Sequence, residues 1–167
     1  RAAPLALPVR SYARYRGPLI RGLLHLKYRP NRALASLMGT WLAGVARKEG
    51  WTPSCVVPVP LGDERQRQRG YNQAALIAAG LADRLTLPVL EKALRRTRET
   101  RSQVGLDAVS RHLNVHGAFQ ADPDLIAGRV VCIVDDLCTT GATLSACAEA
   151  ALDSGATATL GLTVGRA

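Results

Sequence analysis

The chain has 167 residues, of which 47% are hydrophobic and 4% aromatic, and its formal net charge at neutral pH is +9. This length suits one domain with a sizeable core, and no apolar stretch reaches the roughly 18 to 20 residues that cross a membrane. The composition excludes a disordered tail, a collagen-like rod and a transmembrane protein. We predict a single domain over residues 1–167, and the prolines near the start argue against a signal peptide.

The charge is distributed unevenly along the chain. Residues 1–101 contain 19 Lys or Arg and 6 Asp or Glu, a net +13, whereas residues 102–167 contain 3 and 7, a net −4. Most of the cations are arginines, whose planar guanidinium binds phosphate or carboxylate through two hydrogen bonds. An anionic partner and an arginine-rich solvated surface explain this pattern about equally well.

The first part of the chain is predicted to be helical. Apolar residues at helical spacing predict a short amphipathic helix over residues 18–27, which Pro18 can begin. Asn31 is expected to cap a longer helix that ends near Gly50. Its predicted apolar stripe comprises Leu34, Leu37, Met38, Trp41, Leu42 and Val45. We therefore interpret residues 1–50 as a helical N-terminal part and residues 54–167 as a separate core region of the same domain.

Strands and helices are predicted to alternate in this core region. In chain order, the predicted elements are a buried strand (54–60), a polar loop (61–73), an alanine-rich helix (74–85), a strand (88–94), a mobile arginine-rich loop (95–117), a strand (129–136), a helix (142–152) and a strand (156–164). Such alternation is typical of an α/β fold in which helices cover both faces of a parallel sheet.

Four cysteines stand at positions 55, 132, 138 and 147. Their spacing matches neither a zinc site nor a small disulfide framework, so a reducing cytoplasm is the expected location. Cys55 and Cys132 lie in apolar runs and are expected to be buried, inert thiols. Cys138 is the exception, because it lies in a loop that carries polar chemistry.

That loop follows the strongest strand of the sequence. The strand ends in Asp135 and Asp136, and two residues later, before a predicted helix, come Thr139, Thr140, Gly141, Ala142 and Thr143. Helix N-terminal amides, threonine hydroxyls and a glycine that permits close backbone approach form an anion site. The acids suit a ligand that presents hydroxyls or magnesium beside its phosphate, as a ribose phosphate does. The simpler alternative is that the acids only cap the following turn.

The same segment resembles the signature of type I phosphoribosyltransferases, in which an apolar strand, two acids and two spacer residues precede Thr-Thr-Gly-Ala-Thr. The resemblance implies a parallel sheet flanked by helices, with a small hood and a flexible loop. It implies that the residues from Thr139 to Thr143 bind the 5-phosphate of phosphoribosyl pyrophosphate (PRPP). Asp135 and Asp136 would be the catalytic acids that hold the ribose hydroxyls, with Mg²⁺ bound directly or through PRPP.

Other segments resemble the ComF-type branch of this family, and the likeness extends from about Tyr15 to Arg166. The matching segments are YRGPLIRGLLHLKY, PVPLGDERQRQRGYNQA and TRETRSQVGLDAVSRHLNVHGAF. By this resemblance, the residues on the pyrophosphate side are Val59, Pro60, Leu61, Arg67 and Arg69, and those of the flexible loop are Arg98, Gln103 and Arg111. Relatives often begin with a four-cysteine zinc module, which is not present in this chain.

Three functions remain open from the sequence. The first is a PRPP-binding protein of natural transformation and DNA uptake, with a competence helicase and a DNA-processing protein as partners by resemblance. The second is an active magnesium-dependent phosphoribosyltransferase of nucleotide metabolism or salvage. The third is a competence factor that binds single-stranded DNA through Arg65, Arg67 and Arg69, which a strand-like spacing would place on one face. The acceptor substrate and the oligomeric state stay open.

Overall fold

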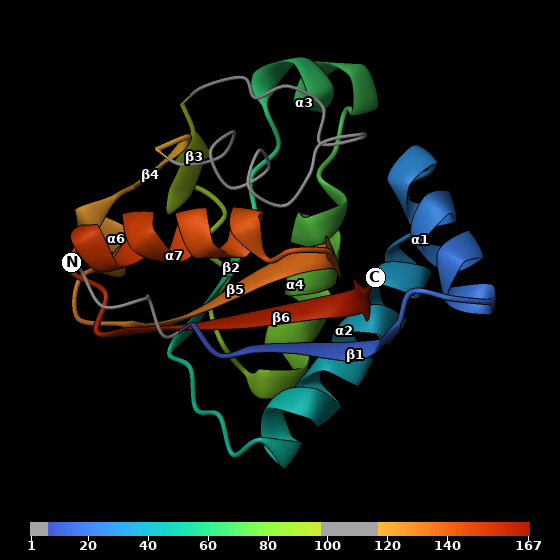
Figure 1. Cartoon of the computed structure of the whole chain (residues 1–167), viewed down its shortest axis with the longest axis horizontal. Coiled ribbons are helices and arrows are strands. Elements are labelled where there is room, and N and C mark those ends of the chain that lie inside the picture. Colours follow the sequence, from blue (N-terminus) through green and yellow to red (C-terminus); the bar gives the residue numbers. More distant parts are fainter. Residues whose placement is uncertain (1–6, 98–116) are drawn as a thin grey trace.

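The computed structural model describes residues 7–97 and 117–167, and its centre is a parallel sheet of four strands (Figure 1). In spatial order these strands are β1 (Val9–Arg14), β6 (Ala158–Arg166), β5 (Val130–Cys138) and β2 (Cys55–Pro58). Each neighbouring pair is parallel, as the alternation of predicted elements required. The α/β prediction is confirmed.

Helices cover both faces of this sheet, with α7 on one side and α2 and α4 on the other (Figure 1). The β5 side chains alternate between these faces, since Val131 and Ile133 pack in the cluster with α7 whereas Cys132 and Val134 pack in the cluster with α2 and α4. An apolar run that is buried on both faces is typical of a central parallel strand. The helices are α1 (Pro18–Tyr28), α2 (Arg32–Lys48), α3 (Asp63–Arg69), α4 (Gln73–Leu85), α6 (Pro123–Ile126) and α7 (Ala142–Asp153).

The first two predicted helices are confirmed, and all residues of the predicted α2 stripe except Leu37 pack in the core. Asn31 caps α2 by accepting a hydrogen bond from the Leu34 N–H at 2.9 Å. Leu37, expected in the core, is 47% exposed. The buried face consists of Ala35, Met38, Gly39, Leu42, Ala43 and Ala46. Small residues dominate this face because α2 lies so close to α4 that a Cβ on Gly39 would be 2.4 Å from the Gly80 carbonyl carbon.

Two predictions about strands are corrected by the structure. The interpretation of residues 1–50 as helical is wrong for Val9–Arg14, which form the edge strand β1 beside β6. The predicted strand over 88–94 is reduced to a single parallel bridge between Val89 and Val56. The next strand, β3 (Leu94–Arg96), instead pairs antiparallel with β4 (Phe119–Ala121) in a separate small sheet. Neither β4 nor α6 was predicted.

All four cysteines are buried and free. Burial raises the pKa of Cys132 to about 12, and it also raises the pKa of Cys55, Cys138 and Cys147. The expectation of buried thiols at Cys55 and Cys132 is confirmed, and Cys138 is buried as well. Among the residues that the structure describes, no helix is both long and apolar enough to span a bilayer.

Candidate functional site

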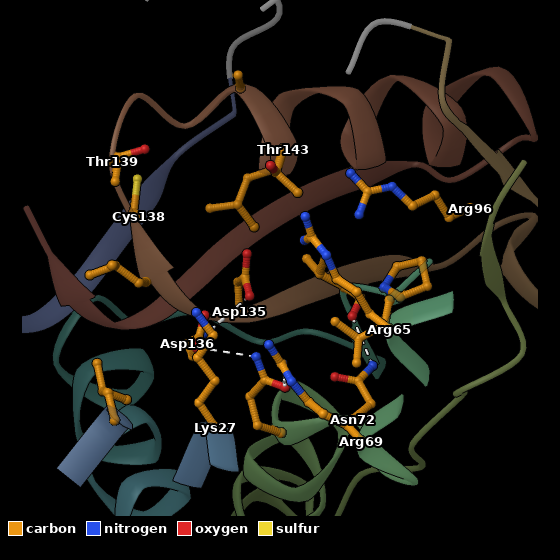
Figure 2. Close-up of a pocket in the computed structure, with 18 of the residues that line it drawn as sticks. Lys27, Arg65, Arg69, Asn72, Arg96, Asp135, Asp136, Cys138, Thr139 and Thr143 are labelled. Atoms are coloured by element: carbon orange, nitrogen blue, oxygen red, sulfur yellow. Dashed lines mark hydrogen bonds between the residues drawn. The ribbon is translucent and has the colours of Figure 1, made fainter. Parts of the chain in front are cut away.

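A cavity of about 630 Å³ opens at the carboxyl end of β5, where α1, α3, α4 and the start of α7 converge (Figure 2). The predicted site residues that line it are Val59, Pro60, Leu61, Arg69, Asp135, Asp136, Thr139, Thr140, Gly141, Ala142 and Thr143. Arg67 does not line it. Arg98, Gln103 and Arg111 lie outside the described residues. The structure thus brings together residues from two segments that are about 70 positions apart in the chain.

One end of the cavity is built from the loop after β5 and the first turn of α7. Gly141 precedes the helix with φ +82°, a left-handed conformation that glycine adopts without strain. The Ala142 N–H donates to the Thr140 Oγ1 at 3.3 Å, which braces the loop. Because the N–H groups of a first helical turn point along the axis, this end of the cavity is electropositive and suited to an anion.

Asp135 and Asp136 form the acidic side of the same cavity. They lie within β5, which extends to Cys138 and therefore runs two residues beyond the predicted strand. The Asp136 N–H donates to the Asp135 Oδ1 at 2.9 Å. Burial raises the pKa of Asp135 well above its usual range, and the Asp136 carboxylate raises it further. The oxygens of both acids are acceptors for ligand hydroxyls, and the raised pKa of Asp135 favours its neutral form, which is also a donor.

The acid pair also bears on whether Mg²⁺ fits this site. Within residues 7–97 and 117–167, no group of three or more His, Cys, Asp or Glu side chains could hold a metal ion. Mg²⁺ is commonly bound by one or two carboxylates together with the phosphates of a substrate. Asp135 and Asp136 thus fit a Mg²⁺ ion that enters with a phosphorylated ligand.

The arginine-rich segment is a helix, so the predicted polar loop over 61–73 and its strand-like spacing are wrong. Residues four apart share one face of a helix, and accordingly Arg65 and Arg69 line the cavity. Arg67 lies between them in sequence, and its Nε donates to the Asp63 carbonyl at 3.3 Å. Two acids in the first turn, arginines in the last turn and Gly70 with φ +74° are the local signals that favour this helix.

Asn72 and Gln73 connect this arginine helix to the rest of the site. Asn72 caps α4 by accepting from the Ala74 N–H at 3.0 Å, and its Nδ2 donates to the Val59 carbonyl at 2.9 Å. The latter bond fixes the Val59–Leu61 turn against the cavity. Gln73 contacts Asp136 and Arg69. The Arg-Gly-aromatic-Asn-Gln segment was recognised in the sequence, but neither residue was predicted to belong to the site.

The opposite wall is formed by α1 and the residues before it, which the sequence did not assign to the site. Tyr15, Leu24, Lys27 and Tyr28 line the cavity there, and Arg96 lines it from β3. The Tyr71 hydroxyl donates to the Leu26 carbonyl at 2.6 Å and so attaches α1 to the start of α4. The cavity therefore has an electropositive end, an acidic side, two arginines on α3 and a partly apolar wall.

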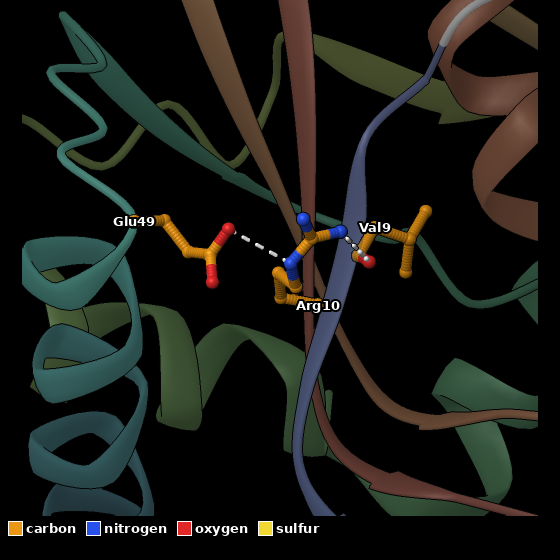
Figure 3. A network of polar contacts seen from close by, with 3 residues as sticks. All are labelled: Val9, Arg10 and Glu49. Carbon is orange, nitrogen blue, oxygen red and sulfur yellow. Dashed lines mark hydrogen bonds and ion pairs between the residues drawn. The ribbon is translucent and has the colours of Figure 1, made fainter.

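A second surface combines cations and aromatic rings along the edge strand β1. This β1 surface is formed by Arg10, Tyr12, Arg14, Trp41 and Trp51. Tyr12 stacks on Trp41 with ring centres 4.7 Å apart, and the Arg10 guanidinium lies 6.0 Å from the centre of the Trp51 ring. The Arg10 Nε also donates to Glu49 at 2.8 Å (Figure 3). Tyr12 remains 45% exposed.

Comparison with known proteins found several relatives with related names, although no family model matches the chain. It is 40% identical over 95 residues to Competence protein F of Haemophilus influenzae, a match that covers 56% of this chain and 42% of the relative. It is 38% identical over 106 residues to the DNA utilization protein YhgH of Escherichia coli, covering 64% and 46%. It is 33% identical over 105 residues to Competence protein ComFC of Bacillus subtilis, a match that covers 63% of this chain and 41% of the relative. The matched segment spans less than half the length of each of these relatives.

Solved structures show the same fold. Glutamine PRPP amidotransferase from B. subtilis matches with a TM-score of 0.55 and 18% identity over 84% of this chain and 30% of that one. A structure described as the allosteric regulatory enzyme of purine biosynthesis matches with a TM-score of 0.53 and 19% identity, over 84% of this chain and 30% of that one. At such identities the likeness concerns the fold alone.

Proposed function

Because the chain is homologous to ComF-type competence proteins and has the type I phosphoribosyltransferase fold, we propose that its cavity binds PRPP. The observation that carries the proposal is the single cavity that joins the loop from Thr139 to Thr143 with Asp135 and Asp136. An electropositive helix start beside two acids suits a ligand with a phosphate at one position and hydroxyls a few ångströms away. A ribose 5-phosphate group has this arrangement.

The remaining groups of PRPP find partners in the same cavity. The 5-phosphate accepts hydrogen bonds at the start of α7, and the ribose hydroxyls contact Asp135 and Asp136. Arg65 and Arg69 face the pyrophosphate, since they share one side of α3. Mg²⁺ bound with PRPP supplies positive charge that neutralises the phosphate oxygens. In place of Arg67, the proposal therefore assigns Arg65 to the pyrophosphate side.

Turnover would require an acceptor in addition to PRPP. A nitrogen nucleophile would attack C1 of the ribose, the bond from C1 to the pyrophosphate oxygen would break, and the nucleophile would lose a proton. The arginines of α3 would stabilise the charge that develops on the departing pyrophosphate. Catalysis of this kind in nucleotide metabolism is the enzymatic version of the proposal, and PRPP binding without transfer is the non-enzymatic one.

The cellular role that we propose is DNA uptake during natural transformation. It is supported by the relatives named competence proteins and DNA utilization protein. The partners implied by the resemblance are a competence helicase and a DNA-processing protein. The match spans less than half of each relative, so these partners belong to the proposal.

Calorimetric titration with PRPP and Mg²⁺ tests the binding proposal. We expect saturable binding to the wild-type protein and weaker binding of ribose 5-phosphate, which lacks the pyrophosphate. The double substitution Asp135→Asn and Asp136→Asn should reduce PRPP affinity at least about 100-fold, equivalent to about 2.7 kcal/mol. The wild-type and double-variant circular dichroism spectra serve as the folding control. Absence of heat with wild-type protein at millimolar PRPP would refute the proposal.

Single-stranded DNA binding is a second candidate function, and the β1 surface is the observation that favours it. Aromatic rings stack on bases irrespective of sequence, and arginines neutralise the phosphates of the strand. Arg10, Tyr12 and Arg14 occupy alternate positions of β1, so they lie on one side of the strand. This arrangement replaces the arginine face that the sequence predicted on residues 65–69, where Arg65 and Arg69 line the cavity instead.

Fluorescence anisotropy with a labelled oligothymidylate tests this candidate at several salt concentrations. A plot of log affinity against log salt concentration has a negative slope. If β1 holds two phosphates, the double variant Arg10→Ala with Arg14→Ala should make this slope shallower by about 1.4. The control variant, Lys92→Ala with Arg95→Ala, removes the same charge from exposed positions elsewhere. No binding at low salt, or an equal change in both variants, would exclude the β1 surface as the binding site.

A further inference from the structure

Gln73 is a buried polar residue between the arginine helix and the acid pair. It is the first residue of α4, and the residue is 6% exposed. Its Oε1 accepts a hydrogen bond from the Arg69 Nη1 at 2.7 Å, and its Nε2 donates to the Asp136 Oδ2 at 3.3 Å. Arg69 and Asp136 are both directed toward the cavity (Figure 2). One amide thus joins three elements, α3, α4 and β5.

The two neighbours fix the orientation of this amide. A guanidinium offers only donors, so the atom facing Arg69 must be the carbonyl oxygen. The NH₂ group therefore faces Asp136, where Nε2 donates to the carboxyl Oδ2. The reversed amide would place donor against donor and acceptor against acceptor. The positions of Arg69 and Asp136 are therefore coupled through a side chain with one permitted orientation.

Other side chains of similar length satisfy only part of this arrangement. Glutamate would keep the contact with Arg69 but would place a second carboxylate beside Asp136. Lysine would contact Asp136 but would repel Arg69. Methionine fills the same volume and makes neither hydrogen bond. Glutamine is suited to this position because it carries an acceptor and a donor on one planar group.

We propose that Gln73 is a positioning residue, which sets the distance between the Arg69 guanidinium and the Asp136 carboxyl group. It thereby favours ligands in which a ribose carries a further anionic group, such as a pyrophosphate, over ligands that lack this group. The inference rests on the proposed binding of PRPP. A ligand with hydroxyls and a pyrophosphate contacts both groups at once, whereas ribose 5-phosphate contacts only the acid side. Gln73 should therefore contribute more to PRPP affinity than to ribose 5-phosphate affinity.

The test measures both ligands, in the presence of Mg²⁺, against wild-type protein and two variants. Gln73→Met removes both hydrogen bonds, and we expect PRPP affinity to fall about ten-fold more than ribose 5-phosphate affinity. Gln73→Glu is isosteric and keeps the contact with Arg69. It should weaken both ligands by a similar factor, because it disturbs only the acid side, where the contact with Asp136 is replaced by repulsion between two carboxylates. The ratio of the two affinities is the informative readout, since a general loss of structure would lower both affinities together.

Gln120→Met is the matched control. Gln120 also accepts a hydrogen bond from an arginine, the Arg95 Nη2 at 2.6 Å, but neither residue lines the cavity. It should leave both affinities unchanged. If wild-type protein does not bind PRPP, the proposed function fails and this inference fails with it. If wild-type protein binds PRPP and Gln73→Met leaves the affinity ratio unchanged, the inference alone is overturned.

Discussion

Replacing Gly39 by alanine is expected to destabilise the fold by about 3 kcal/mol, the upper end of what added volume in a packed core costs, because the overlap is with backbone. A Cβ at this position would lie 2.4 Å from the Gly80 carbonyl carbon and 2.4 Å from the Leu81 nitrogen. These are backbone atoms of α4, so no rotamer change relieves the overlap. The helices α2 and α4 would have to move apart, exposing apolar residues that both now bury.

Gly44→Ala provides the control in the same helix. Nothing lies within 4 Å of a Cβ at Gly44, and the residue is exposed. Alanine there should stabilise the protein by roughly 0.5 to 1 kcal/mol, because glycine loses more backbone entropy on folding. Urea unfolding followed by circular dichroism measures both variants. Equal stability of Gly39→Ala and wild-type protein would show that α2 and α4 are not in the close contact described here.

The same contact bears on the site, because α4 begins at Gln73. Where a Gly39 variant still folds, separation of α2 from α4 would shift the start of α4 relative to Asp136. Loss of ligand affinity without any change in a cavity-lining residue is therefore expected in such a variant. Positions far from the cavity can weaken binding through small displacements of the groups that contact the ligand.

The central part of the fold could be predicted because its signals are local. The run from Val130 to Val134, the two acids and the loop before α7 are contiguous in the sequence, and each favours the same strand, loop and helix. Asn31 and Asn72 likewise mark helix starts by a bond within three residues. For such features, neighbouring residues suffice to determine the structure.

Features that depend on distant partners were missed. The strand β1 pairs with β6, whose residues follow about 150 positions later, and its own sequence alternates without a strong apolar pattern. The buried face of α2 follows the small residues Ala35, Gly39 and Ala43, because Gly80 of α4 approaches closely, whereas the large apolar residues were used to predict it. Gln73 became part of the site only when α3, α4 and β5 were assembled. The α3 helix was missed for another reason. Its order of charges and its flanking glycines are local signals of a helix, but the alternation of Arg and Gln was interpreted as the spacing of a strand.

Asp135→Asn is expected to change stability and ligand binding in opposite directions. In the folded protein, burial and the Asp136 carboxylate raise the pKa of Asp135 well above its usual range. The folded state therefore holds this proton more tightly than the unfolded chain, whose aspartate has a pKa of about 3.9. Stability from this group is complete below the unfolded pKa and is lost as pH rises through the folded pKa. Asparagine avoids that loss because it carries no charge.

Thermal unfolding without ligand and with a chelator should consequently show a higher Tm for Asp135→Asn at pH 8, by about 2 to 4 °C for each kcal/mol recovered in a chain of this size. The gain should shrink as pH falls, and it should disappear below about pH 3, where wild-type Asp135 is protonated in both states. Asp83→Asn, at an exposed position of α4, should show no such trend. Calorimetry at neutral pH should meanwhile find PRPP binding at least about ten-fold weaker, equivalent to about 1.4 kcal/mol. A variant Tm at pH 8 that is equal to or below the wild-type Tm would contradict the burial of Asp135 and its repulsion by Asp136. Higher stability together with weaker binding would indicate that this carboxyl group serves the ligand at a cost in stability.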